Sequence, residues 1–112
     1  MIGMTAEVIN FRPRRLRCDE AEKIVQELAE RSENVILTDH AKERMGERDI
    51  LVRDMHRILK TGYVTEDPEQ KETGEWTCKI TKQLRGNREA GVVTLIQSRG
   101  KLLVLTVEWE DL

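Results

Sequence analysis

One histidine and two arginines recur at intervals of four residues near the middle of the chain: His40, Arg44 and Arg48. In a helix, residues four apart lie on one side, so His40 and Arg44 could act on a single target. Arg48 extends the row if the helix continues that far. Imidazole titrates near neutral pH, whereas guanidinium keeps its charge and offers a fork of donors. The spacing indicates a site for a phosphate or another anion, with the solvated face of a charged helix as the structural alternative.

The same residue types could cleave RNA without a metal ion. That reaction needs a group that moves the proton of the ribose 2′-hydroxyl, and cations that stabilise charge on the phosphorane-like transition state. His40 could be the general acid or base, since the start of a helix nearby favours the neutral imidazole. Arg44 and Arg48 could hold the phosphate in fork geometry. Lys79, from a later strand, could neutralise the developing charge.

Two groups of cations could bind a nucleic-acid backbone. They are Arg12, Arg14, Arg15 and Arg17 near the N-terminus, and Lys79, Lys82, Arg85 and Arg88 in the C-terminal half. The net charge is −2, so no global field attracts a polyanion and any such site must be a local patch. Each group could equally be solvated surface or the protected edge of a hairpin.

Three segments together resemble the domain-of-unknown-function 4258 family. They read TDHAKERMGERDI at 38–50, VRDMHRILKTGYV at 52–64 and LLVLTVEW at 102–109. The family pattern is a His-Ala-x-x-Arg-Met helix, Arg-x-Ile, a second helix that ends at glycine, and antiparallel strands. The family is grouped by fold with RelE/ParE-type toxins and related small nucleases. The resemblance implies that fold, implies RNA or an antitoxin-like protein as a partner, and carries over His40, Arg44 and Arg48 as site residues.

Length and composition describe a single soluble domain. The chain has 112 residues, of which 38% are hydrophobic and 36% charged. The apolar run 102–105 is far shorter than the ~20 residues that span a bilayer, and the first ten residues do not resemble a secretory signal, so we expect a cytoplasmic protein. Cys18 and Cys78 lack ligand spacing, and His40 and His56 lie on different predicted helices. We therefore expect no metal site and no cofactor.

Apolar periodicity predicts helices over 19–32, from Thr38 to about Glu47, and over 51–60. Asp19 and Thr38 are the expected caps of the first two helices, and His56 is expected to be half-buried. From position 63 the period changes to two. It predicts strands over 63–66, 75–84, 92–97 and 102–109. The inward residues of the last strand are expected to be Leu103, Leu105, Val107 and Trp109.

The order of elements predicts an α+β fold in which three N-terminal helices pack on one face of a four-stranded antiparallel meander. Residues 19–112 form this single domain, and residues 1–18 form an arm or a short strand over 7–11. By the resemblance, the opposite face of a RelE/ParE-like sheet is the working surface.

Two functional hypotheses follow, together with a purely structural one. The first is a toxin-like, metal-independent ribonuclease. The second is a non-catalytic module that binds protein or nucleic acid, although four aromatic residues provide few platforms for base stacking. In the structural alternative, His40 packs between helix and sheet while Arg44 or Arg48 pairs with a nearby carboxylate.

Overall fold

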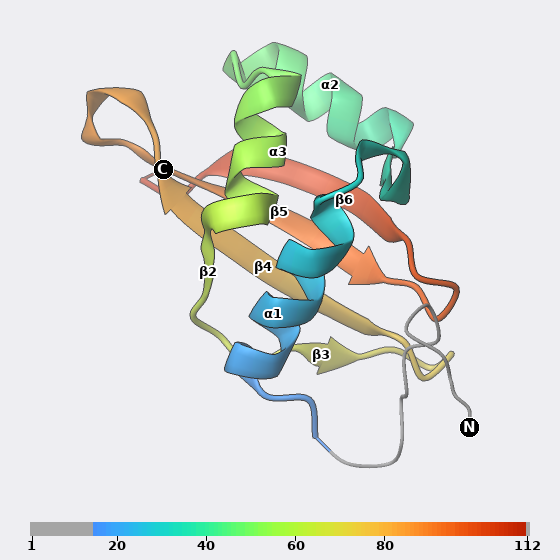
Figure 1. Ribbon diagram of the computed structural model, residues 1–112. Helices are drawn as coiled ribbons and strands as arrows, with labels where there is room; N and C mark the ends of the chain where they lie inside the picture. Colours follow the sequence, from blue (N-terminus) through green and yellow to red (C-terminus); the bar gives the residue numbers. More distant parts are fainter. Residues whose placement is uncertain (1–14, 112) are drawn as a thin grey trace.

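A computed structural model describes residues 15–111 and contains three helices beside one sheet (Figure 1). The helices are α1 (Cys18–Ala29), α2 (Asp39–Arg48) and α3 (Val52–Thr61), with short 3-10 turns at Ser32–Asn34 and Arg85–Asn87. The strands are β1 (Val35–Leu37), β2 (Tyr63–Val64), β3 (Glu69–Gln70), β4 (Trp76–Gln83), β5 (Glu89–Ile96) and β6 (Leu102–Trp109). The predicted α+β class with three helices is confirmed. The strand expected over 7–11 lies outside the described residues.

The sheet is mixed and six-stranded, so the four-stranded antiparallel meander was wrong in detail. The strand order is β1-β6-β5-β4-β2, and β3 also pairs with β4. β4, β5 and β6 are antiparallel neighbours, as predicted. β1 pairs with β6 in parallel, with Val35 opposite Leu102. By sequence, residues 35–37 read as a short buried strand or an extended connector, and the structure shows a strand. Its pairing partner could not be read from the sequence, because β6 is distant in the chain.

The helix boundaries follow from local capping. Thr38 caps α2 as predicted, because its Oγ1 accepts the Ala41 N–H at 3.1 Å. The helix ends at Asp49, which adopts the left-handed conformation with φ of 56°. The start of α1 differs from the prediction, since Arg17 rather than Asp19 is the N-cap residue. The Glu20 carboxylate accepts the Arg17 N–H at 3.0 Å.

A β-bulge decides which residues of β6 reach the core. Val93 lies opposite Thr106, but the next residue, Thr94, lies opposite Val104, which leaves Leu105 as the extra residue. One extra residue reverses the alternation of side chains along a strand. The buried residues of β6 are therefore Leu102, Val104, Val107 and Trp109. The predicted inward positions Leu103 and Leu105 are only half-buried.

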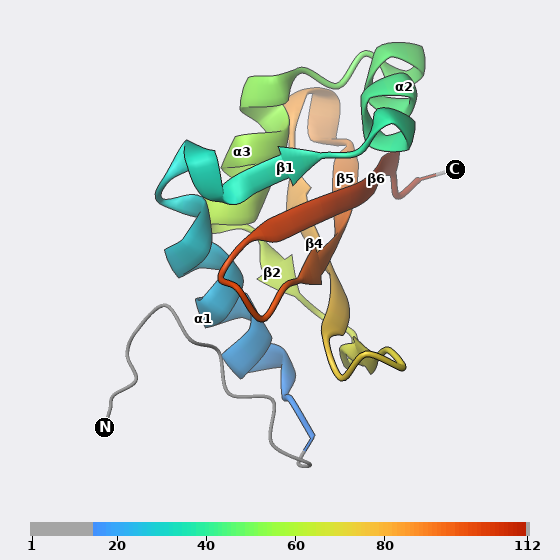
Figure 2. The same cartoon turned by 90° about the vertical axis from the view of Figure 1, so that its right-hand side faces the viewer.

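The helices divide between one face and one edge of the sheet (Figure 2). α1 and α3 pack together on one face, where Val25, Met55 and Ile58 are fully buried. α2 lies along β6 beyond the end of β1 (Figure 2). No described helix covers the other face, which we call the open face.

Candidate functional site

His40 and Arg44 form a pair on the outer surface of α2. His40 lies in the first turn, directly after the Thr38 cap, and is exposed. The Arg44 Nε–H points to His40 Nε2 at 3.5 Å, a long contact that requires a lone pair on that nitrogen. Arg44 also forms an ion pair with Glu47. His40 does not pack between helix and sheet, so that part of the structural alternative is wrong.

Arg48 does not continue the row of His40 and Arg44 on the surface. Its NH1 donates to the carbonyl oxygen of Val107 at 2.9 Å. Its own carbonyl accepts the indole N–H of Trp109, also at 2.9 Å. Both bonds join the end of α2 to β6, beyond the part of this strand that pairs with β1. The side chain predicted to hold a phosphate thus satisfies a backbone carbonyl of the sheet.

Lys79 lies on the open face between two carboxylates. Its Nζ is 2.8 Å from Glu110 and 3.2 Å from Glu108. The hydrogen bond with Glu110, followed by that with Glu108, holds the pKa of Lys79 above its usual value despite partial burial. Gly91 makes room for this arrangement, because a Cβ there would lie 2.6 Å from Glu110 Oε2. The cluster carries a net negative charge, which disfavours a phosphate.

The structure does not bring the four predicted catalytic residues together. Lys79 lies opposite Val93, which lies opposite Thr106 on β6. Two strand spacings place Lys79 roughly 10 Å from the strand beside α2. Within residues 15–111, no hydrogen bond or ion pair joins Lys79 to His40, Arg44 or Arg48.

Most of the predicted nucleic-acid contacts have carboxylate partners. Arg12 and Arg14 lie outside the described residues. Arg15 pairs with Asp67 at 2.6 Å, and Arg17 with Asp19 at 3.4 Å. Their charges are therefore locally balanced.

The C-terminal group is also largely balanced. Arg85 pairs with Asp54 at 2.9 Å. Arg88 pairs with Asp111 at 3.0 Å and stacks over the Trp109 ring at 4.0 Å. Lys82 is half-buried on β4, and no ion pair with a described residue is found for it. Neither group forms a continuous basic patch within residues 15–111.

A row of cations that the sequence reading missed lies on α3. Arg53, Arg57 and Lys60 are exposed, while the opposite side of the helix is buried in the core. Arg53 and Arg57 are the two arginines of residues 15–111 whose guanidinium group has no hydrogen-bond or ion-pair acceptor. The other eight each have one: Arg15, Arg17, Arg31, Arg44, Arg48, Arg85, Arg88 and Arg99.

The spacing of this row was visible in the sequence. Positions 53, 57 and 60 are separated by four and three residues, which places them on one helix face. The apolar positions of the same segment lie on the opposite, buried side of the helix. Burial, and then the charge of Lys60, holds the pKa of the adjacent His56 below its usual value. His56 is half-buried, as predicted.

An exposed aromatic residue follows the basic row. Tyr63 begins β2 and is 59% exposed. It lies opposite Thr81, which is two residues from Lys79 on β4, so Tyr63 points to the open face and not to the face that carries α3. Gly62 allows the chain to pass between α3 and β4, because a Cβ there would lie 2.6 Å from the Ile58 carbonyl oxygen and 2.7 Å from that of Thr81. Three cations on α3 are thus followed, within three residues, by an exposed ring at the sheet edge that faces the opposite side of the sheet.

No group of three or more His, Cys, Asp or Glu side chains in the described part of the chain could hold a metal ion. Cys18 and Cys78 are free thiols, half-buried and buried respectively. No helix among residues 15–111 is long and apolar enough to cross a membrane.

The fold defines a small α+β domain whose mixed sheet carries helices on one face and one edge. The family model for the domain of unknown function (DUF4258) matches residues 37–109, from the end of β1 to the end of β6. The chain therefore belongs to the DUF4258 family. No curated protein and no solved structure matches it significantly.

Proposed function

We propose that this domain is a non-catalytic module that binds single-stranded RNA through α3. The observation that carries the proposal is the absence of a carboxylate partner for Arg53 and Arg57 in a described surface where every other arginine has an acceptor. An unpaired guanidinium can contact a phosphate without first breaking an ion pair, and its fork suits two phosphate oxygens.

The dimensions of the row fit a nucleic-acid backbone. Seven residues separate Arg53 from Lys60, which corresponds to about 10 Å along the helix axis. Tyr63 follows on the edge strand β2, where its exposed ring on the open face can stack on a base once the bound strand passes around this edge. Stacking of this kind contributes ~1–3 kcal/mol per base and tolerates any sequence. The base faces of a duplex are already stacked, so these features favour a single strand.

The experiment measures binding of a fluorescently labelled, mixed-sequence RNA by anisotropy. The double variant R53Q/R57Q should bind at least about tenfold more weakly. The slope of log affinity against log salt concentration should become shallower by roughly one to two, because one or two phosphate contacts are lost. The matched control R31Q/R99Q removes the same charge from two exposed arginines elsewhere and should change affinity less than about twofold. Tyr63→Ser should weaken binding without changing the salt slope. Equal losses in both double variants, or no binding by the wild type, would contradict the proposal.

The finer fold assignment is also a proposal. A RelE/ParE-like arrangement is supported by helices that precede three consecutive antiparallel strands, β4, β5 and β6. The parallel pairing of β1 with β6 adds an edge strand to this pattern.

A second candidate function is metal-independent RNA cleavage at His40 and Arg44. It is favoured by one specific contact, in which the Arg44 Nε–H lies 3.5 Å from Nε2 of the exposed His40. His40→Ala should then abolish cleavage of a mixed-sequence RNA in chelator, since a proton-transfer group contributes ~10²–10⁴-fold in rate. Arg44→Lys should be nearly as damaging. RNA binding without cleavage by the wild type would leave only the binding function.

A further inference from the structure

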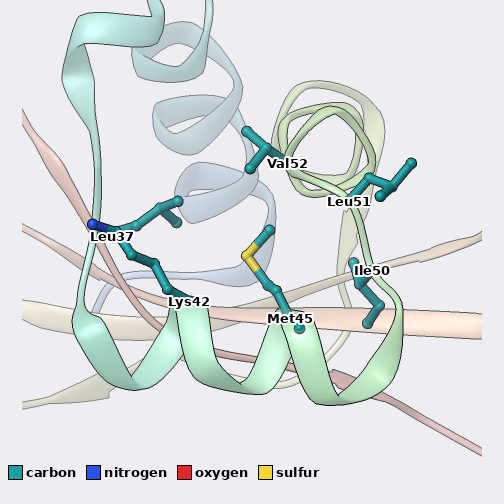
Figure 3. Close-up of a pocket in the computed structure, with 7 residues that line it drawn as sticks. Leu37, Lys42, Met45, Ile50, Leu51 and Val52 are labelled. Atoms are coloured by element: carbon teal, nitrogen blue, oxygen red, sulfur yellow. The ribbon is translucent and has the colours of Figure 1, made fainter.

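An apolar groove opens between β1, α2 and the start of α3 (Figure 3). Its volume is about 250 Å³, and its apolar lining includes Leu37, Met45 and Ile50. Leu51 and Val52 form its rim and are 48% and 51% exposed. With Tyr63 they are the exposed large hydrophobic residues of the described chain. Neighbouring exposed apolar side chains beside a groove are typical of an interaction site.

Gly46 keeps this groove open. It lines the groove from within α2, although glycine is a poor residue for a helix interior. A Cβ at this position would have no heavy atom within 4 Å. The glycine is therefore not required by close packing, and a larger side chain there would occupy the groove.

The outer edge of β1 offers backbone groups beside the same groove. The Thr38 N–H donates to Val104 on β6 at 3.2 Å. Backbone groups alternate in direction along a strand, so the N–H and C=O of Leu37 point away from β6. No described backbone group bonds to either of them. Unpaired strand edges of this kind are templates for another strand.

Lys42 supplies the charge that selects a partner. It is the charged residue of the groove lining, it is exposed, and no described carboxylate pairs with it. A carboxylate on a bound segment would complement it. The groove is smaller than the ~300–1,000 Å³ typical of small-molecule sites, which favours an anchoring side chain over a separate ligand.

We propose that β1 and this groove bind an extended segment of a partner protein. The segment pairs with the outer edge of β1, inserts one apolar side chain against Met45 and Ile50, and places a carboxylate two residues away beside Lys42. Residues i and i+2 of a strand lie on the same side, about 7 Å apart, so both side chains can reach the groove. Strand addition of this kind takes affinity from the backbone and specificity from the pocket. The proposal does not depend on RNA binding.

The test uses two synthetic peptides, Ser-Thr-Leu-Thr-Glu-Thr-Ser and the same peptide with lysine in place of glutamate, and follows backbone amide shifts of the full chain by NMR. The glutamate peptide should shift the Leu37 amide and bind several-fold more tightly than the lysine peptide, because an exposed ion pair contributes modestly. Lys42→Glu should invert that preference. Gly46→Leu should weaken binding at least tenfold while the melting temperature is kept. The matched control Glu43→Leu adds the same side chain to α2 outside the groove lining and should bind normally.

Three outcomes would overturn the proposal. The first is an unchanged Leu37 amide at millimolar concentrations of both peptides. The second is equal binding of the two peptides by the wild type and by Lys42→Glu. The third is a concentration-dependent shift of Leu37 without peptide, which would show that a second copy of the chain occupies this edge.

Discussion

Arg48 and Trp109 are joined by a hydrogen bond of 2.9 Å from the indole N–H to the Arg48 carbonyl oxygen. The Arg48 guanidinium donates a hydrogen bond of 2.9 Å to the carbonyl oxygen of Val107, two residues before Trp109. These two contacts attach α2 to the part of β6 that β1 does not reach, and the bond from Thr38 to Val104 holds the start of α2 where β1 ends. α2 therefore takes the place of a strand at this edge.

Arg48→Met should destabilise the protein. Methionine keeps the apolar stem but cannot donate to the Val107 carbonyl, and an unsatisfied buried acceptor costs about 1–3 kcal/mol. Urea unfolding should show this loss. The matched variant Arg44→Met removes contacts with exposed side chains and should change the free energy of unfolding by less than ~1 kcal/mol. Equal stability of both variants would argue that the bond from Arg48 to the Val107 carbonyl does not stabilise the attachment of α2 to β6.

Two glycines should respond in opposite directions to alanine. Gly62→Ala forces a Cβ against two backbone carbonyl oxygens and should cost about 1–3 kcal/mol or more. Gly46→Ala adds a Cβ in open space within a helix and should stabilise the protein by roughly 0.5–1 kcal/mol. Thermal melting of both variants measures the difference. A stable Gly62→Ala protein would show that the junction between α3 and β2 is looser than the structure indicates.

Stability should fall as the pH drops through the titration range of His56. Burial and then Lys60 hold the pKa of His56 below 6.5 in the folded state, so the unfolded chain binds more protons in this range. Folding is thus favoured fully above pH ~6.5 and weakened progressively below it. His56→Gln should flatten the dependence of the unfolding free energy on pH between 7.5 and 5. An unchanged slope would assign the effect to other groups.

The two thiols should differ in reactivity. Burial raises the pKa of the Cys78 thiol to about 12, which leaves almost no thiolate near neutral pH. Cys18 is half-buried, and its pKa is also raised, by desolvation and then by its contact with Asp67. Iodoacetamide should modify Cys18 slowly in the native protein and Cys78 only after unfolding. Mass spectrometry of Cys18→Ser should therefore show no native labelling; rapid native labelling of Cys78 would contradict its burial.

Local signals in the sequence were sufficient for the three helices and for β2, β4, β5 and β6, but not for the two-residue strand β3. The Thr38 cap is a property of one helical segment, as is the burial of Ala41 and Met45 four residues apart, so spacing alone is enough to predict both. The alternation of apolar and polar residues in β4 likewise puts Cys78 and Ile80 on one face, and both are buried. His40 and Arg44 are four residues apart, and this separation correctly predicted that they are neighbours on a helix.

Tertiary structure decided everything that depends on partners far apart in the sequence. The bulge at Leu105 arises from the pairing of β5 with β6 and reverses a pattern that looks regular in β6 alone. Arg48 and Lys79 looked like free cations, but Val107 and the carboxylates of Glu108 and Glu110 reach them only after folding. Arg53 and Arg57 have no such partner, because folding brings no described carboxylate or carbonyl oxygen within bonding distance of them. Ion pairs and hydrogen bonds form between groups that are close in space. Residue type and local spacing do not give the distance between residues far apart in the sequence, so these partners could not be predicted.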